Sequence, residues 1–110
     1  MTKRQNGLLQ GTADVLILKT LAWAPMHGYG ISQWIDERSK GELAVEDAAL
    51  YQALHRLERK GLVESEWAIS EKNHRAKYYR LTSAGRRQLR SEIAELRSYM
   101  AVLFRVLDAA

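Results

Sequence analysis

The spacing of apolar residues in the last quarter of the chain constrains its fold more than any other feature. Between Ser83 and Leu107, large apolar side chains recur at alternating intervals of four and three residues, at Leu89, Ile93, Leu96, Met100, Leu103 and Leu107. This alternation is typical of coiled-coil seam positions. It predicts one helix on the order of 35 Å long, with Thr82 as its N-cap. Tyr99, Val102 and Val106 widen the apolar stripe, so the helix is expected to contact more than one other element.

The length and composition of the chain favour self-association. Its 110 residues fit one domain with one appended element, and an apolar content of 46% excludes a mainly disordered chain. Because a domain of this size is marginally stable alone, a long helix that buries its apolar face against a second copy would add stability. We therefore expect a homodimer joined through the six seam residues of the last helix.

The charge of the chain favours an anionic partner. Lys and Arg number 17 against 13 Asp and Glu, which gives a net charge of +4. Between residues 72 and 90 there is no acidic residue, and this segment contains seven cations, namely Lys72, Arg75, Lys77, Arg80, Arg86, Arg87 and Arg90. A solvated charged surface is the alternative explanation of this run. The last three of these arginines start a helix, where positive charge opposes the dipole, so acids elsewhere are their alternative partners.

Several classes of protein are disfavoured by what the sequence lacks. There is no cysteine, so disulfides, thiolate metal ligands and cysteine nucleophiles are excluded, which suits a reducing cytosol. No apolar run approaches the roughly 18 residues of a membrane span, and residues 1–10 lack the apolar core of a signal peptide. We therefore expect a cytoplasmic protein that does not associate with membranes.

The sequence also disfavours an enzyme and a metal or cofactor site. It contains no phosphate-cradling glycine motif, no nucleophile elbow and no paired carboxylates in an apolar setting. His27, His55 and His74 lie in three different expected elements, without the local spacing of metal ligands. Neither a metal nor a cofactor is therefore expected.

The first half of the chain is expected to contain two helices joined by a turn. The first helix runs from Thr12, as its N-cap, to Ala24, and residues 24–30 form the turn because they include the only proline and two glycines. The apolar face of the second helix consists of Ile31, Trp34 and Ile35. This helix ends in the polar residues 38–41, and residues 42–46 are expected to be a brief extended segment.

The third helix is the most informative segment. It is expected to begin at Asp47, as its N-cap, and to end at Gly61, which provides a left-handed stop. At 100° per residue, one side of this helix is an apolar stripe made of Leu50, Ala53, Leu54 and Leu57. The opposite side, with Tyr51 at its edge, consists of Ala48, Gln52, His55, Arg56 and Arg59. This second side is expected to face out of the domain.

Two strands are expected after the third helix. Residues 62–69 are predicted as the first strand, residues 70–76 as a polar loop, and residues 77–81 as the aromatic returning strand. The tip of this hairpin is basic and polar, with Lys72, Asn73, His74, Arg75 and Lys77. Such a tip suits contact with phosphates or with the minor groove of DNA, and a soluble turn is the alternative.

Three helices followed by a two-stranded hairpin is the order of a winged helix-turn-helix, in which the third helix enters the major groove. The expected fold is therefore mainly α with a small β hairpin. Residues 1–82 are expected to form a DNA-binding domain, and residues 83–110 a C-terminal dimerisation helix. Double-stranded DNA is the expected partner, with Gln52 and Arg56 as candidates for base or phosphate contacts, and Tyr51 and His55 for phosphate contacts. A winged helix that contacts only proteins is the competing interpretation.

Three segments of the chain carry motifs of a known family. The segment 50–62 reads LYQALHRLERKGL, the segment 77–85 reads KYYRLTSAG, and residues 11–31 include MHGYGI. In this order they resemble the recognition helix, the wing exit and the first two helices of the PadR family of bacterial transcriptional regulators. The resemblance covers nearly the whole chain. It departs at Gln52, where the family commonly has proline, and a glutamine adds a side chain that can read adenine.

The resemblance implies a homodimeric regulator, usually a repressor, of the short subgroup with a single C-terminal dimerisation helix. A two-fold dimer is expected to bind an inverted-repeat operator. The resemblance also implies that a small aromatic or drug-like effector can bind near the dimer interface and weaken the DNA complex. Trp23, Trp34 and Trp67 are candidates for lining such a pocket, although burial in the core is the more usual role of these side chains.

Overall fold

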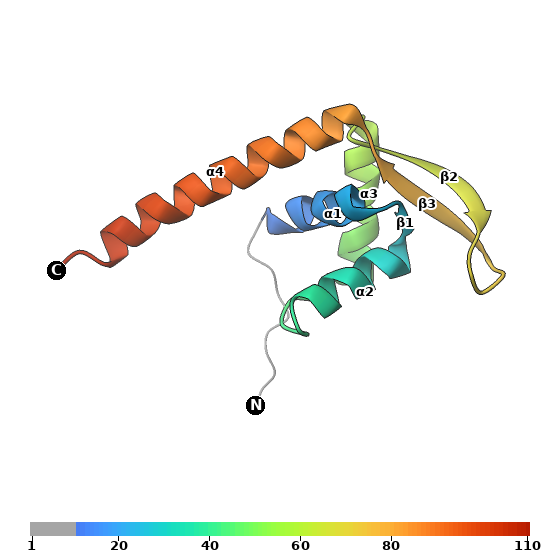
Figure 1. Cartoon of the computed structure of the whole chain (residues 1–110), viewed down its shortest axis with the longest axis horizontal. Helices are drawn as coiled ribbons and strands as arrows, with labels where there is room; N and C mark the ends of the chain where they lie inside the picture. Colours follow the sequence, from blue (N-terminus) through green and yellow to red (C-terminus); the bar gives the residue numbers. More distant parts are fainter. Residues whose placement is uncertain (1–10) are drawn as a thin grey trace.

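The computed structural model describes residues 11–110 (Figure 1). Its elements follow in the order α1 (Thr12–Trp23), β1 (Met26–His27), α2 (Gly28–Arg38), α3 (Asp47–Arg59), β2 (Val63–Ile69), β3 (Arg75–Leu81) and α4 (Ser83–Leu107). The expected mainly α fold, with three helices, a hairpin and a long last helix, is confirmed. Figure 1 shows α1, α2 and α3 packed together, with the hairpin at one end and α4 extending away at the other.

Apolar side chains from the three packed helices meet in one core. The stripe expected on α3 is confirmed, because Leu50, Ala53, Leu54 and Leu57 are all buried. The other core residues are Ile17, Leu18, Leu21, Ile31, Ile35, Val45, Val63, Tyr79, Leu81 and Leu89. Each fully buried aliphatic side chain contributes about 2 kcal/mol through removal from water. Burial of one side of α3 fixes the rotation of this helix and leaves its polar side open to solvent.

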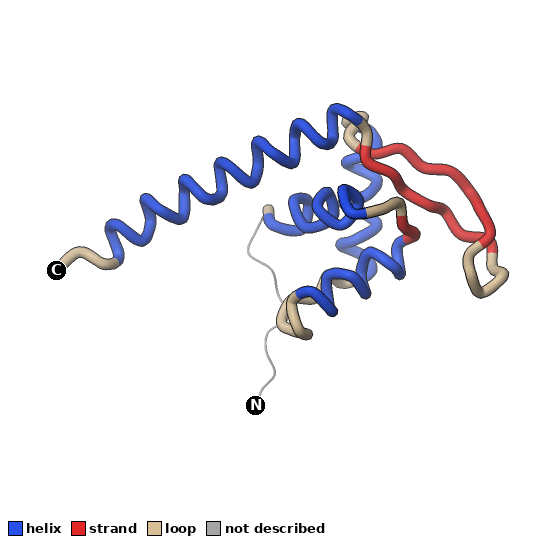
Figure 2. Tube along the Cα trace, in the orientation of Figure 1, coloured by secondary structure: helices blue, strands red, loops and turns tan. Residues whose placement is uncertain are grey.

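The sheet has one strand more than the sequence predicts. Its order is β1-β3-β2, with both neighbouring pairs antiparallel (Figure 2). β2 and β3 form the expected hairpin, whereas Met26 and His27 of β1 pair with Tyr79 and Tyr78 of β3. Residues 24–30 are therefore not only a turn. A strand of two residues is too short to show periodicity, and its pairing partner lies some 50 residues away in the sequence, so no local pattern reveals it.

Two predicted N-caps are wrong by one residue. Thr12 and Asp47 are the first helical residues of α1 and α3, and the cap positions are occupied by Gly11 and Glu46, neither of which makes a side-chain cap hydrogen bond. In the first turn of α3, the carboxylate of Asp47 still lies at the favourable positive end of the helix dipole. α1 also ends at Trp23 rather than Ala24, because Ala24 is extended.

The predicted stop of α3 and the predicted cap of α4 are both confirmed. Gly61 has a φ of 74°, and its N–H donates to the carbonyl of Glu58 at 3.0 Å, while the N–H of Leu62 donates to the carbonyl of Leu57 at 3.0 Å. This pair of bonds is the Schellman motif, which needs a left-handed residue. At α4, the hydroxyl of Thr82 accepts from the N–H of Gly85 at 3.0 Å.

Residues 42–46 form a loop between α2 and α3 and do not join the sheet, and Glu46, the cap of α3, has extended backbone. The connection is instead held by Ser39, whose hydroxyl accepts from the N–H of Leu43 at 2.9 Å. Leu43 and Val45 pack against the core from this loop, which explains their alternation without strand pairing.

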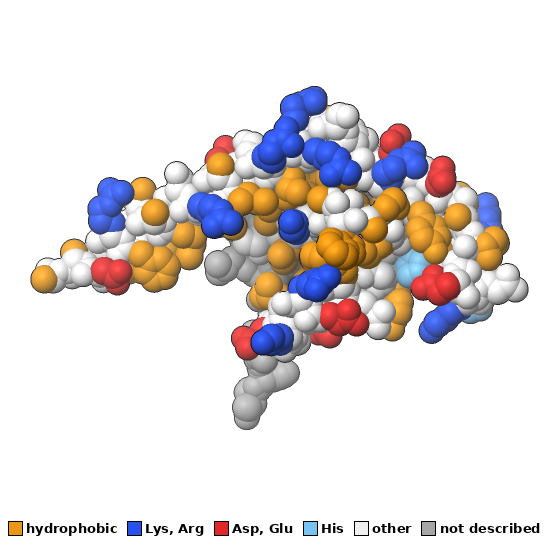
Figure 3. Space-filling view, viewed as in Figure 1, with side chains coloured by type: hydrophobic (Ala, Val, Ile, Leu, Met, Phe, Trp, Pro, Cys, Tyr) orange, Lys and Arg blue, Asp and Glu red, His pale blue; other side chains and the backbone are white. Residues whose placement is uncertain are grey.

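The first part of α4 packs on the rest of the domain, and its second part does not. Leu89 is only 7% exposed within the core of its own chain, and Ile93 packs against that core. Leu89 is therefore buried in its own chain and is unsuited to the predicted contact with a second copy. From Leu96 onward the apolar side chains are largely exposed, and Figure 3 shows them along α4. In the described part of the chain, neither α4 nor any other helix is long and apolar enough to cross a membrane.

Two of the three tryptophans lie outside the core, contrary to the usual role of such residues. Trp23 is 66% exposed and Trp67 is 56% exposed, whereas Trp34 packs partly buried against the core. The guanidinium of Arg38 lies 5.3 Å from the ring centre of Trp23 and 5.0 Å from that of Trp34. Trp23 therefore contacts a cation at the surface instead of packing in the core.

Candidate nucleic-acid interface

Five of the six residues predicted on the polar side of α3, or at its edge, form one open surface. Ala48, Gln52, His55 and Arg59 are exposed, and the side chain of Tyr51 is half exposed. We call these five residues the recognition face. The face is rigid, because the four buried residues of α3 anchor the helix to the core.

Arg56 does not belong to the recognition face. Its Nη2 atom donates to Oδ1 of Asp14 at 2.6 Å, in an ion pair between α3 and α1. The side chain of Arg56 is 43% exposed and that of Asp14 is 22% exposed, so the pair is partly shielded from water. The structure therefore gives Arg56 a partner within the chain, and the DNA contact that the sequence predicts for it stays a prediction. A partner 42 residues away in the sequence is not readable from a helical pattern.

A groove of about 720 Å³ lies between the start of α2, the recognition face and the hairpin. We call it the wing groove. Its aromatic and cationic lining residues are His27, Tyr29, Tyr51, Trp67, Tyr79, Lys72, His74, Arg75 and Lys77, and Glu71 also lines it. Tyr51 belongs both to this groove and to the recognition face. Rings beside cations are the surface that a sugar–phosphate strand needs, since cations bind phosphates and rings contact the sugars and bases.

The position of Tyr51 depends on the glycine that begins α2. A Cβ atom at Gly28 would overlap the hydroxyl of Tyr51, whereas one at Gly30 would meet its nearest neighbours at an ordinary 3.5 Å. Gly28 therefore allows the phenol of α3 to lie directly against the first turn of α2. This contact joins the recognition face to the wing groove.

The hairpin loop is shorter than the sequence predicts. β3 begins at Arg75, so Arg75 and Lys77 are strand residues and the loop spans residues 70–74. The turn closes because the N–H of Ser70 donates to the carbonyl of His74 at 2.7 Å, with Asn73 in the left-handed region at a φ of 62°. Lys72, Asn73 and His74 are exposed at the tip, as expected.

The two faces of the hairpin differ in charge. Trp67 pairs with Lys77, and Ile69 with Arg75, on the face that continues into the core and lines the wing groove. On the other face, Arg80 forms an ion pair with its cross-strand neighbour Glu64 at 3.2 Å. The cations of the first face are thus turned toward the groove, while the cation of the opposite face is paired with an acid.

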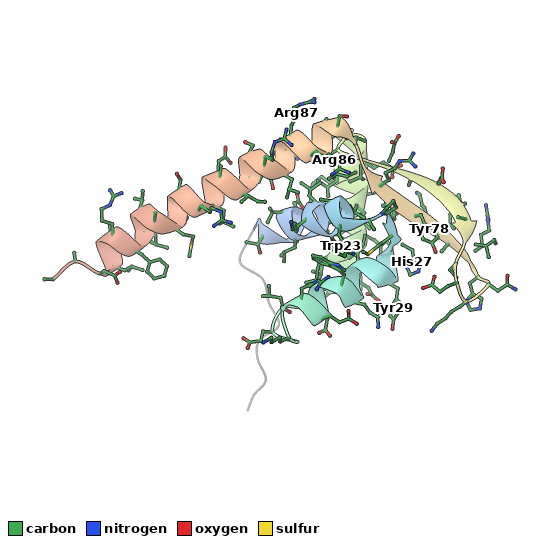
Figure 4. All side chains as sticks on the ribbon, viewed as in Figure 1. Trp23, His27, Tyr29, Tyr78, Arg86 and Arg87 are labelled. Carbon is green, nitrogen blue, oxygen red and sulfur yellow. The ribbon has the colours of Figure 1, made fainter. Side chains whose placement is uncertain are left out.

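His27 is a functional candidate that the sequence analysis missed. Its Nδ1 atom caps α2 by accepting from the N–H of Gly30 at 3.0 Å, so the ring proton lies on Nε2, which is 3.9 Å from Glu71 in the hairpin loop. The ring also contacts Tyr78 edge-on at 5.1 Å and stacks with Tyr29 at 6.5 Å (Figure 4). The available sequence signal was its position directly before Gly28, which is the N-cap position of α2. Among the described residues, no cluster of His, Asp and Glu is arranged to hold a metal ion.

Tyr79 forms part of the inner wall of the wing groove. Burial is the main reason that its pKa is raised above the usual value, and the nearby Glu58 and Tyr51 raise it further. Because the phenol keeps its proton, its hydroxyl remains a hydrogen-bond donor at neutral pH. Lys77 lies close by, with its Nζ atom 4.0 Å from Glu58 and 5.8 Å from the ring centre of Tyr79.

The run of cations in the sequence does not form one surface. Lys72, Arg75 and Lys77 line the wing groove. Arg86, Arg87 and Arg90 are exposed on α4 instead, and Figure 4 places Arg86 and Arg87 well away from His27 and Tyr29. The basic run therefore divides into a hairpin group and a group at the start of α4.

Solved structures of other proteins share this fold over most of the chain. A PadR family transcriptional regulator from Eggerthella lenta is 30% identical, with a TM-score of 0.80, over 92% of this chain and 86% of that one. A PadR family transcription regulator from Clostridium difficile is 32% identical, with a TM-score of 0.76, over 88% and 99% of the two chains. PadR of Bacillus subtilis in complex with operator DNA is 22% identical, with a TM-score of 0.66, over 74% of this chain and 46% of that one.

The family assignment rests on the sequence as well as on the fold. Residues 17–91, which run from α1 into α4, match the transcriptional regulator PadR-like family. This span contains the whole recognition face and the whole hairpin. The expectation drawn from the three motifs is confirmed: the chain belongs to the PadR-like family of transcriptional regulators.

Proposed function

We propose that this regulator binds duplex DNA sequence-specifically, as a homodimer on an inverted-repeat operator, and represses transcription there. The observation that carries the proposal is the recognition face of α3 beside a groove lined by cations and aromatic rings. The binding of operator DNA by the Bacillus subtilis protein, which shares this fold, supports the same proposal. The cytoplasm, where such a regulator meets DNA, is the proposed location.

The division of labour within the proposed interface follows from exposure and chemistry. The recognition face enters the major groove, where Gln52 is suited to read adenine through its amide. Tyr51 and His55, one turn apart on α3, contact phosphates. Lys72, Asn73, His74, Arg75 and Lys77 of the hairpin bind the flanking backbone or the minor groove.

The proposed dimer is formed by the projecting half of α4, residues 96–107. Leu96 is 41% exposed and Leu107 is 63% exposed, and Met100 and Leu103 lie between them on the same stripe. Leu89 is left out of the proposed seam, since its own chain buries it. An apolar stripe of this length on a helix that leaves the domain is stable in water when a second copy covers it.

Release of the DNA by a small aromatic effector is the remaining part of the proposal. Its support is the exposed aromatic side chains on the projecting half of α4, where Tyr99 is 63% exposed and Phe104 is 48% exposed. An effector that stacks on these rings would change how the two copies meet and hence the spacing of the two recognition faces.

Selection of bound duplexes from a random-sequence pool tests the central part of this function. We expect one inverted repeat to be enriched, and Gln52→Ala to weaken binding of the enriched duplex roughly tenfold, the usual cost of one base contact. Gln88→Ala, which removes the same amide from α4 outside both the recognition face and residues 96–107, is the matched control and should bind as wild type does. A pool without any enriched sequence would refute sequence-specific binding and leave a protein-contact role as the alternative.

A further inference from the structure

We propose that Trp67 is a positioning residue, which holds the guanidinium of Arg75 in place for a backbone phosphate of duplex DNA. This inference rests on the proposed function and adds to it a residue outside the recognition face. The two side chains come from neighbouring strands of the hairpin, and both line the wing groove.

The exposure of Trp67 calls for a role other than packing. The indole is 56% exposed on β2, an edge strand of the sheet, and it is not part of the core. A large exposed aromatic side chain on a strand edge increases the risk of unwanted association. A specific contact between Trp67 and another side chain explains why this exposed position carries an indole, the largest side chain.

The geometry of the pair supplies that contact. Trp67 lies opposite Lys77 in the register of the hairpin, and Arg75 is its diagonal neighbour on the same face. The guanidinium carbon of Arg75 lies 4.5 Å from the ring centre of Trp67, within the range of a cation–π contact. A ring against one face of the guanidinium leaves the N–H donors at its edge free to bind two oxygens of one phosphate.

The charges around the hairpin single out Arg75 from the two other strand cations. Arg80 forms an ion pair with Glu64, and Lys77 lies 4.0 Å from Glu58. Within residues 11–110, Arg75 forms no ion pair with a carboxylate. Its charge is therefore available to a ligand, while the ring limits its motion without neutralising it.

A phosphate of the DNA backbone fits this arrangement. The groove also contains Lys72 and Lys77, so a polyanionic strand is the ligand that its charge favours. Arginine loses less entropy on binding when its side chain is already ordered, and this gain is the reason to hold it against an indole.

A double-mutant cycle on the full chain tests the proposal, using the duplex enriched from the random pool. We expect Arg75→Ala to weaken binding about tenfold, as for loss of one charge-assisted phosphate contact, and to reduce the salt slope by about one. Trp67→Leu should weaken binding about threefold, the value of an exposed cation–π contact. Trp67→Phe, which keeps an aromatic ring, should lose much less binding than Trp67→Leu. The double variant should bind no more weakly than Arg75→Ala alone.

The controls separate this proposal from its alternatives. Arg80→Ala removes a cation from the other face of the same hairpin and should bind as wild type does. Thermal unfolding of Trp67→Leu should stay close to wild type, because the indole is not in the core. If Trp67→Leu weakens binding by the same factor with and without Arg75, the pairing is wrong although the proposed function stands. If wild type binds no duplex at all, the proposed function itself fails.

Discussion

At the scale of single residues, Gly28 determines where Tyr51 can lie. A Cβ atom at this position would overlap the phenol, so we expect Gly28→Ala to displace Tyr51 from the wing groove and to weaken DNA binding roughly fivefold. Gly30→Ala is the matched control, because it adds the same methyl group to the same helix turn without a close contact. Titration of the enriched duplex measures both variants. Equal binding by the two variants would contradict the role assigned to Gly28.

The ion pair of Arg56 with Asp14 gives a second prediction at this scale. We expect Arg56→Ala and Asp14→Ala each to lower the free energy of unfolding by roughly 1 kcal/mol, with the double variant losing less than the sum. Arg59→Ala is the control, because Arg59 is exposed one turn further along α3. This variant should change the free energy of unfolding by less than about 0.5 kcal/mol. Urea unfolding measures these values. A stable Arg56→Ala variant that loses DNA binding would show instead that Arg56 contacts DNA.

At the scale of elements, the sequence predicted the parts that repeat. The 3.6-residue period of α3 and the apolar spacing of α4 identify both helices, because α3 buries one apolar stripe and α4 carries one along its length. β1 was missed since two residues carry no period, and the alternation at residues 42–46 belongs to a packed loop that joins no sheet. The exposure of Trp67 and the pairing of Arg56 were not predictable, because they depend on residues distant in the sequence or on which side of an edge strand faces the groove.

The junction between the hairpin and α4 provides a test at this scale. Thr82 accepts from the N–H of Gly85, and its hydroxyl donates to the carbonyl of Gly61 at 2.8 Å. Thr82→Ala should therefore lower the free energy of unfolding by about 1–2 kcal/mol, while Thr82→Ser, which keeps the hydroxyl, should lose much less. Denaturant titration compares the two variants. Equal losses would mean that the methyl group of Thr82, and not its hydroxyl, stabilises the junction.

At the scale of the whole molecule, α4 links the domain to its proposed second copy. The first part of α4 completes the core through Leu89, so the helix direction is fixed by the domain and the projecting half carries that direction to a partner. Two rigidly attached recognition faces then have one defined separation. This geometry is what an inverted repeat of fixed spacing requires.

The dimer has its own prediction. Leu103→Glu places a charge in the proposed seam without touching the core, so the variant should remain folded and become a monomer at micromolar concentration. Ser98→Glu adds the same charge on the opposite side of the helix, and this variant should remain a dimer. Sedimentation velocity distinguishes the two outcomes. Dimers of Leu103→Glu as stable as those of wild type would place the seam elsewhere.

The central claim, that two copies read one duplex through paired recognition faces, is tested most directly by hydroxyl-radical footprinting of the enriched duplex with the bound stoichiometry measured in parallel. We predict two chains per duplex and two symmetric protected segments on the same side of the DNA, about one or two helical turns apart. A single chain bound to one asymmetric segment would contradict this account.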